Sequence, residues 1–258
     1  MPAILLDVDG VLSVSGEAIA GGAAAVDRLR RDGHRLRFVT NNTTRSRATL
    51  AAELRDLGIE LEDDELQTTG TAAAHALAGK RVLALTMHGI VDDLDGIELV
   101  GEGADAVLIG GADETFETNH VFSYTNLARA FHELEAGAEL YCLHKNRWWQ
   151  TSDGPLLDSG AFVAGLEFAA DTEAVVLGKP SPAYFGAALE ALDADAGLAW
   201  MVGDDIDLDI AGAQRQGLKT VLVRTGKFRP DEVERSGVVP DAILSSIAFL
   251  PAWLERTS

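Results

Sequence analysis

Short apolar runs alternate along the chain with longer stretches of helical periodicity. Runs of strand length end at Asp7 and recur at residues 81–86, 106–109, 140–143, 175–177, 199–202, 220–223 and 242–245, and residues 35–39 alternate as a strand. Apolar residues on one helical face predict helices at residues 21–31, 50–57, 71–78, 127–134, 162–169, 185–192 and 212–217. Residues 13–16 are predicted to form a loop. Strands that alternate with helices predict an α/β protein with a parallel sheet.

The alternation starts a second time at about Thr71. The middle of the chain has strands and helices of its own, so it can fold as a separate small domain. The strands after it resume the pattern of the first part, which predicts one α/β domain interrupted by another. A chain of 258 residues is long enough for one large domain or two smaller ones.

The composition indicates a soluble protein with an acidic surface. Apolar residues make up 47% of the chain, and 41 acidic against 21 basic residues give a formal net charge of −20. This charge disfavours nucleic acid and anionic lipid as partners, and an anionic substrate would need locally positive groups to bind. No run approaches the roughly 18 apolar residues of a membrane span, and the first strand begins too early for a signal peptide. Because Cys142 is the single cysteine, we expect a cytoplasmic protein without an intrachain disulfide.

Two aspartates follow the first apolar strand. Asp7 and Asp9 lie two residues apart and precede Gly10. Side chains at i and i+2 of a strand point to the same side, and ligands of open α/β sheets bind at the carboxyl edge. Two close carboxylates need a cation, or one of them keeps a proton, which suits a metal-bound nucleophile beside a proton donor and acceptor. An Asx-type turn that only closes the strand is the other interpretation.

Two further stretches carry candidate phosphate-binding residues. Thr40 and Asn41 follow the second strand and could orient a phosphoryl oxygen, or could form only the N-cap of the next helix. Lys179 lies between Gly178 and Pro180, which restrict its backbone. It could balance the aspartates and bind a phosphate oxygen, or be an ordinary turn lysine.

A cluster of acidic residues follows the strand at 199–202. Four of the seven residues from Gly203 onward are acidic, namely Asp204, Asp205, Asp207 and Asp209. Such a cluster is costly unless it is solvated or bound to a cation. Mg²⁺ prefers octahedral oxygen coordination and commonly uses one or two carboxylates with waters and a substrate phosphate. The strand-end residues therefore fit a magnesium site for a phosphorylated substrate, without His or Cys ligands.

These stretches resemble, in order, the four motifs of haloacid dehalogenase (HAD) superfamily phosphatases. The matching segments are residues 7–11, 40–41, 178–180 and 203–209. The insertion between the second and third motifs looks like the C2-type cap of the NagD-like subclass IIA. Residues 38–41, 176–182, 203–206 and 223–230 are similar to a group of pyrophosphate and phosphoramidate phosphatases within it. The resemblance implies a Rossmann-like HAD core with a parallel sheet at residues 1–75 and 176–258, and an inserted α/β C2-type cap domain at residues 76–175.

The resemblance also implies catalytic and metal-binding roles. Asp7 would be the nucleophile that forms an aspartyl phosphate, and Asp9 would be the general acid and base. Asp7, the backbone carbonyl of Asp9, and Asp204 would hold Mg²⁺. Val11 stands where many members of the superfamily carry Thr, next to this catalytic pair.

The remaining motif residues are implied to bind substrate or to support the metal site. Thr40 and Asn41 would bind the transferring phosphoryl group, and Lys179 would neutralise both the nucleophile and the phosphate. Asp209 and Asp205 would support the metal site from the acidic stretch.

The sequence thus predicts a Mg²⁺-dependent phosphatase of a small phosphorylated metabolite, and the resemblance alone suggests pyrophosphate or phosphoramidates as substrates. A phosphomutase or phosphotransferase on the same core stays open, as does a non-catalytic Mg²⁺-binding interaction module. The basic and aromatic stretch His144–Trp149 either contacts the substrate or packs on the neighbouring domain. The family resemblance also suggests a homodimer formed through the cap.

Overall fold

The computed structural model describes residues 2–113, 115–151 and 154–257. The chain forms two compact units: unit 1 is Met1–Thr40, Ala48–Gln67 and Lys179–Ser258, and unit 2 is Asn41–Arg47 and Thr68–Gly178. A discontinuous α/β unit interrupted by a second one agrees with the predicted fold class. The domain boundaries predicted after residues 75 and 175 stay predictions. In the structure, the chain passes from one compact unit to the other after residues 40, 47, 67 and 178.

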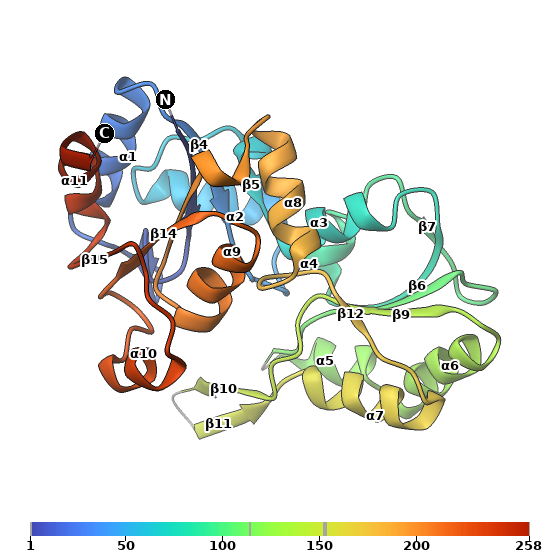
Figure 1. Ribbon diagram of the computed structural model, residues 1–258. Coiled ribbons are helices and arrows are strands. Elements are labelled where there is room, and N and C mark those ends of the chain that lie inside the picture. The colour runs from blue at the N-terminus through green and yellow to red at the C-terminus, as the bar shows by residue number, and fades with distance from the viewer. Residues whose placement is uncertain (1, 114, 152–153, 258) are drawn as a thin grey trace. The chain divides into compact units, whose positions relative to one another are not determined.

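Unit 1 is built on a six-stranded parallel sheet (Figure 1). The strand order is β15–β14–β13–β1–β4–β5. The strands are β1 (Ala3–Asp7), β4 (Arg35–Val39), β5 (Leu66–Gln67), β13 (Trp200–Gly203), β14 (Lys219–Val223) and β15 (Ala242–Leu244). All five residues of β1 are buried, as expected for a central parallel strand covered on both faces.

Helices cover both faces of this sheet because its strands carry apolar side chains on both sides. The longer ones are α1 (Gly22–Arg31), α2 (Arg47–Asp56), α8 (Pro182–Ala191), α10 (Pro230–Ser236) and α11 (Leu250–Thr257). On one face, Val26 and Leu254 pack in the same core as Leu6 of β1. On the opposite face, Leu222 of β14 packs with Ile206 and Ile210. Those two residues belong to a π-helical turn, η3 (Ile206–Ala211), which continues into α9 (Gly212–Arg215).

Unit 2 contains a five-stranded parallel sheet and a hairpin. The sheet order is β12–β9–β8–β6–β7, and β10 pairs with β11 in antiparallel orientation. The strands are β6 (Arg81–Leu85), β7 (Glu98–Leu99), β8 (Ala106–Ile109), β9 (Glu139–Cys142), β10 (Trp148–Thr151), β11 (Gly154–Leu157) and β12 (Val175–Val176). The helices are α3 (Thr69–Ala76), α4 (His88–Val91), α5 (Phe116–Val121), α6 (Tyr124–Glu135) and α7 (Gly160–Ala170). Val107 of β8, Leu140 of β9 and Val163 of α7 pack in one buried apolar cluster, so unit 2 has a core of its own.

One local prediction is wrong. Residues 13–16 were expected to be a loop, but Ser13–Val14 form β2, which pairs with β3 (Glu17–Ala18) in a small hairpin. Strands of two residues are too short to show alternation of apolar and polar positions in the sequence.

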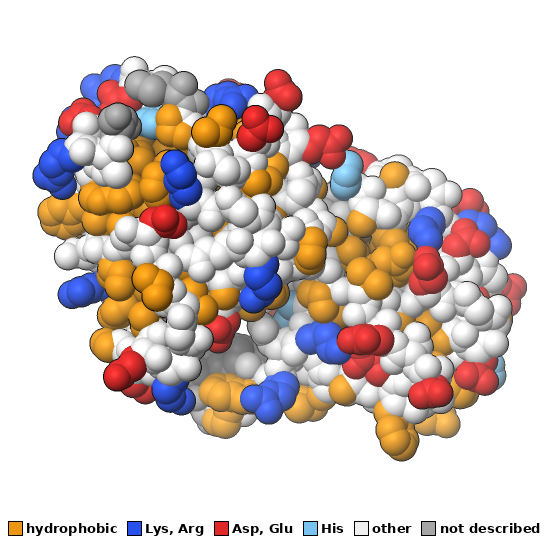
Figure 2. Space-filling model, viewed as in Figure 1, with side chains coloured by type: hydrophobic (Ala, Val, Ile, Leu, Met, Phe, Trp, Pro, Cys, Tyr) orange, Lys and Arg blue, Asp and Glu red, His pale blue; other side chains and the backbone are white. Residues whose placement is uncertain are grey.

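The surface carries charges of both signs. On the face that Figure 2 shows, acidic, basic and hydrophobic side chains are interspersed on each unit. Among the described residues, no helix has the length and hydrophobicity required to cross a membrane.

Candidate active site

Three neighbouring strands of unit 1 end in candidate catalytic residues. β1 lies between β4 and β13, and all three run parallel. Asp7 is the last residue of β1 and is paired with Val39, so Thr40 directly follows the end of β4. Asp204 directly follows β13. Parallel pairing in this register brings Asp7, Thr40 and Asp204 to the same edge of the sheet, although they are far apart in the sequence.

Lys179 binds two carboxylates at this edge. Its Nζ donates to Oδ1 of Asp7 at 2.6 Å and to Oδ1 of Asp209 at 2.7 Å. Lys179 is only 3% exposed, Asp7 6% and Asp209 0%. Buried charges persist when they are paired, and here one ammonium is shared between two carboxylates that the sequence places 202 residues apart.

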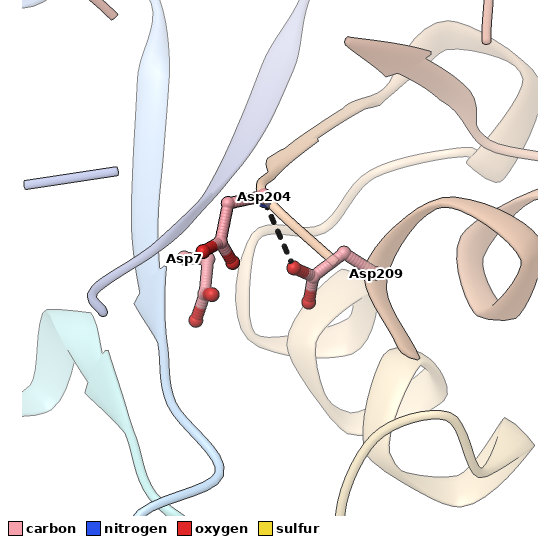
Figure 3. Close-up of side chains that lie close together, drawn as sticks. All are labelled: Asp7, Asp204 and Asp209. Atoms are coloured by element: carbon pink, nitrogen blue, oxygen red, sulfur yellow. Dashed lines mark hydrogen bonds between the residues drawn. The ribbon is translucent and has the colours of Figure 1, made fainter. Parts of the chain in front are cut away.

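Asp7, Asp204 and Asp209 form a cluster of three buried carboxylates (Figure 3). One oxygen from each lies within 4.8 Å of one from the others. The two oxygens of Asp209 are both engaged, because Oδ1 accepts from Lys179 and Oδ2 accepts from the backbone N–H groups of Asp204 and Asp205 at 3.2 Å. Asp209 therefore holds Lys179 and the start of the acidic loop in position.

Of the two carboxylate oxygens of Asp204, one accepts a hydrogen bond and the other has no donor among the described residues. Its Oδ2 accepts from the backbone N–H of Lys227 at 2.6 Å. Its Oδ1 is buried and has no hydrogen-bond partner among the described residues. A buried carboxylate oxygen without a donor is costly unless a cation or a ligand binds it.

Two glycines allow the backbone to approach Asp204 closely. Gly10 and Gly226 both have positive φ, and a Cβ on either would lie about 2 Å from Oδ2 of Asp204 (1.9 Å and 2.0 Å). Thr225 Oγ1 donates to the carbonyl of Gly10, which ties the loop after β14 to the turn after β1. Any larger residue at these two glycines would displace Asp204.

Burial and crowding shift the pKa values of these groups. Burial, then the charge of Asp209, raises the pKa of Asp7 well above its usual range, although Lys179 acts in the opposite direction. Burial raises the pKa of Asp204 to about 6. Burial opposes the charge on Lys179, but Asp209 and Asp7 outweigh it and raise the pKa of Lys179. Three carboxylates around one ammonium leave excess negative charge, which a divalent cation would offset.

Asp9 and Asp205 occupy more open positions. Because β1 ends at Asp7, Asp9 lies beyond the strand in the following turn, where its side chain is exposed. Asp205 is the N-cap of η3, and its Oδ1 accepts from the backbone N–H groups of Asp207 and Leu208 at 3.0 Å and 2.9 Å. Asp205 therefore shapes the acidic loop, while Asp9 stays accessible from solvent in unit 1.

The two predicted phosphate-binding residues fall in different units. Thr40 is the last residue of the first segment of unit 1 and is 1% exposed, whereas Asn41 is the first residue of unit 2. Tyr184 of α8, which the sequence analysis did not single out, fixes Thr40: the Thr40 N–H donates to the Tyr184 hydroxyl at 2.9 Å, and that hydroxyl lies 2.8 Å from the Thr40 carbonyl. Burial raises the pKa of Tyr184, so it stays a neutral hydroxyl.

The loop Thr225–Lys227 was also missed as part of the site. Residues 223–230 resemble the sequences of other phosphatases, but the resemblance implies no role for them. The position of this loop in the sequence is the signal that could indicate its role. The loop follows the apolar strand 220–223, whose carboxyl end lies at the same edge as Asp7.

The basic and aromatic stretch at residues 144–149 lies in unit 2. His144 is 4% exposed, its Nδ1 accepts from the backbone N–H of Asn146 at 3.2 Å, and its Nε2 lies 3.4 Å from Oδ1 of Asp158. Burial lowers the pKa of His144, and the acceptor role of Nδ1 matches a neutral ring. His144 therefore packs inside unit 2, while the side chain of Trp149 lies outside the described residues.

Comparison with known proteins places the chain in a family. The family described as haloacid dehalogenase-like hydrolase matches residues 4–100, and a second HAD-hydrolase-like family matches residues 176–250. The phospholysine phosphohistidine inorganic pyrophosphate phosphatase of Xenopus laevis is 39% identical over 255 residues, covering 95% of this chain and 92% of the relative. The chain belongs to the haloacid dehalogenase-like hydrolase family.

Solved HAD structures share the fold of this chain. The p-nitrophenyl phosphatase from Archaeoglobus fulgidus is 29% identical, with a TM-score of 0.89 and 98% of both chains covered. The glycerol phosphate phosphatase from Mycobacterium tuberculosis, solved with magnesium, is 29% identical, with a TM-score of 0.82 over 95% of this chain and 75% of that one. NagD from Escherichia coli K-12, 24% identical with a TM-score of 0.85, covers 96% of this chain and 97% of its own. These likenesses confirm the predicted HAD fold; NagD, at 24% identity, shows the shared fold alone.

Proposed function

We propose that this HAD phosphatase is Mg²⁺-dependent and hydrolyses small phosphorylated substrates through an aspartyl phosphate on Asp7. The observation that carries the proposal is the buried carboxylate cluster, in which Oδ1 of Asp204 has no donor among the described residues. An all-oxygen set of carboxylates fits Mg²⁺, which prefers hard oxygen ligands. The M. tuberculosis relative was solved in complex with magnesium, which supports the same assignment.

Asp7, Asp204 and the backbone carbonyl of Asp9 would hold the metal ion. Asp209 is close enough to be a ligand, but its oxygens are engaged by Lys179 and by two backbone N–H groups, so its role is to position Lys179. When bound, Mg²⁺ would neutralise charge on the phosphoryl oxygens and align the substrate.

The side chains at the sheet edge can then perform the transfer. A carboxylate oxygen of Asp7 attacks phosphorus, and the bond from phosphorus to the leaving oxygen breaks as Asp9 donates a proton to that oxygen. Water next attacks the phosphorus of the aspartyl phosphate, Asp9 accepts a proton from it, and the bond to Asp7 breaks. Inorganic phosphate leaves, and both aspartates return to their starting state.

Lys179 and the Thr40–Asn41 pair would stabilise the phosphoryl group during both steps. The Lys179 ammonium is already fixed against Asp7, so its charge is in place before phosphate arrives. Preorganised charge of this kind is the main source of catalysis in phosphoryl transfer, where the transition state demands alignment and neutralisation.

The names of the relatives guide the choice of substrates. We include pyrophosphate and phosphoramidates because the Xenopus relative is named for them, and p-nitrophenyl phosphate because the A. fulgidus relative is named for it. The test measures phosphate release from this panel with Mg²⁺ and with EDTA. We expect release that needs Mg²⁺ and that Asp7→Asn abolishes while circular dichroism stays unchanged.

Four outcomes would contradict this proposal. Full activity in EDTA would remove the metal from the mechanism. Most of the activity remaining in Asp7→Asn would remove Asp7 as the nucleophile. Transfer of labelled phosphate to a second hydroxyl group instead of to water would identify a phosphomutase or phosphotransferase on the same core, and no turnover of any substrate would favour a Mg²⁺-binding interaction module.

A further inference from the structure

Lys227 is carried to the catalytic edge of unit 1 by a loop that has little freedom. Thr225 is bonded to the carbonyl of Gly10, Gly226 leaves no room for a side chain, and the Lys227 N–H donates to Asp204. These three consecutive contacts fix the backbone of Lys227 beside the carboxylate that would bind Mg²⁺.

The side chain of Lys227, in contrast, is available. It is 66% exposed, and its Nζ lies 3.8 Å from Oδ2 of Asp205, a loose pair compared with the 2.6 Å and 2.7 Å contacts of Lys179. An exposed pair at this distance contributes little and leaves the ammonium able to turn toward a ligand.

A cavity of about 370 Å³ lies next to this side chain within unit 1. Its lining includes Lys227, Phe228 and Arg229, together with four acidic residues, Asp204, Asp205, Asp207 and Glu232. The cavity therefore adjoins the site proposed for the metal ion and brings two cationic side chains to it.

The small number of lysines in this acidic protein further supports a binding role for Lys227. The sequence has five lysines and a net charge of −20. Lys179 is paired with Asp7 and Asp209. Lys219 is the first residue of β14, so it lies at the opposite edge of the sheet. Lys80 and Lys145 belong to unit 2, where they pair with glutamates. Among the lysines, Lys227 is thus the exposed one at the catalytic edge of unit 1.

We propose that Lys227 is a specificity-determining residue that binds a second anionic group on the leaving side of the substrate. The site would then favour phosphoryl compounds whose leaving group carries its own negative charge, with a diphosphate as the simplest member of the class. The inference rests on the proposed phosphatase function. Its physical basis is that an ammonium near the leaving group stabilises charge that is present in the substrate and grows as the bond to phosphorus breaks.

The test compares the substitutions Lys227→Gln and Lys227→Arg at constant free Mg²⁺. We expect Lys227→Gln to lower the ratio of kcat/KM for pyrophosphate to kcat/KM for p-nitrophenyl phosphate by about tenfold, the effect of one charge-assisted contact. Lys227→Arg should keep most of the ratio. The matched control is Lys219→Gln, which removes the same charge from the other end of β14 and should leave the ratio unchanged.

A binding measurement separates this inference from the phosphatase proposal. In the Asp7→Asn background, calorimetry measures the affinities for Mg²⁺-pyrophosphate and for inorganic phosphate with and without Lys227→Gln. A loss of about tenfold for pyrophosphate alone supports the role of Lys227. Equal losses for both ligands, an unchanged affinity for pyrophosphate, or the same loss in Lys219→Gln would overturn it. Absence of turnover in the wild-type protein would count against the phosphatase proposal instead.

Discussion

At the scale of single residues, the site is defined by an excess of buried negative charge. Asp7, Asp204 and Asp209 surround one buried ammonium, and burial raises the pKa of Asp7 and of Asp204. Asp209 uses both of its oxygens inside the protein, whereas Oδ1 of Asp204 has no partner among the described residues. Burying these carboxylates close together therefore costs free energy, and a bound cation would lower that cost.

We expect Mg²⁺ affinity to fall as the pH is lowered through 6. Burial raises the pKa of Asp204 to about 6 in the metal-free protein, above its unfolded value, so below that pH its carboxyl keeps a proton that Mg²⁺ must displace. The affinity should drop up to about tenfold per pH unit for each proton released. Calorimetric titration at pH 7.5, 6.5 and 5.5, in buffers of different ionisation enthalpy, measures both the affinity and the protons. Equal Mg²⁺ affinities at the three pH values, with no proton release, would refute the competition between Mg²⁺ and a proton on Asp204.

At the scale of elements, strands and their order were more predictable than loops. β1, β13 and β14 are recognisable from their apolar runs, which are typical of strands buried on both faces. β4 is recognisable from its alternation of apolar and polar residues. Parallel pairing then dictates that their carboxyl ends share an edge, which is how Asp7, Thr40 and Asp204 could be grouped from the sequence.

The parts that escaped sequence analysis depend on contacts between distant residues. Tyr184 fixes the end of β4 through its hydroxyl, but a tyrosine on an apolar helix face has no mark of that role in the sequence. The role of Gly226 depends on the close approach of Asp204. The placement of Thr40 and Asn41 in different units likewise required the structure.

The loop after β14 gives a test at this scale. Gly226→Ala should lower both Mg²⁺ affinity and kcat by at least about tenfold, because the added Cβ would lie 2.0 Å from Oδ2 of Asp204 and displace it. Gly237→Ala is a matched control: its φ of 66° is close to the 64° of Gly226, but no atom lies within 4 Å of the added Cβ. Both variants should lose about 1 kcal/mol of stability from the backbone strain, as measured by denaturant unfolding.

The comparison of the two glycine variants separates general backbone strain from the close contacts at Gly226, where the added Cβ would lie 2.0 Å from Oδ2 of Asp204 and 2.6 Å from the Cα of Gly10. If Gly237→Ala impairs Mg²⁺ binding as much as Gly226→Ala, the effect comes from general strain and not from the carboxylate. If Gly226→Ala retains full activity, Asp204 can move without consequence, and its proposed role as a metal ligand is wrong.

At the scale of the whole molecule, the dominant feature is the net charge of −20. Acidic and basic side chains are interspersed on the face shown in Figure 2. Like charges at this density repel one another in the folded state and lower its stability. The cytoplasmic location stays a prediction from the sequence, and the homodimer stays a prediction from the family resemblance.

We expect the metal-free protein to become more stable as salt is added. Raising NaCl from about 20 mM to about 500 mM shortens the Debye length to a few ångströms and should raise Tm by several degrees. Thermal unfolding in EDTA measures the shift. Tetramethylammonium chloride at the same ionic strength should give a similar shift, since screening depends on ionic strength; a Tm that falls with salt would show that attractive ion pairs dominate instead.

The most direct test of the account is to find the phosphorylated residue. Asp9→Asn should slow turnover by about 10²–10⁴-fold through loss of the general acid and base, and hydrolysis of the intermediate should slow with it. Rapid acid quench of this variant with Mg²⁺ and substrate, followed by mass spectrometry of its peptides, reports where the phosphoryl group resides. We predict a single phosphorylated site at Asp7, absent in Asp7→Asn. Turnover with no phosphorylated aspartate, or with phosphate on another residue, would contradict the mechanism.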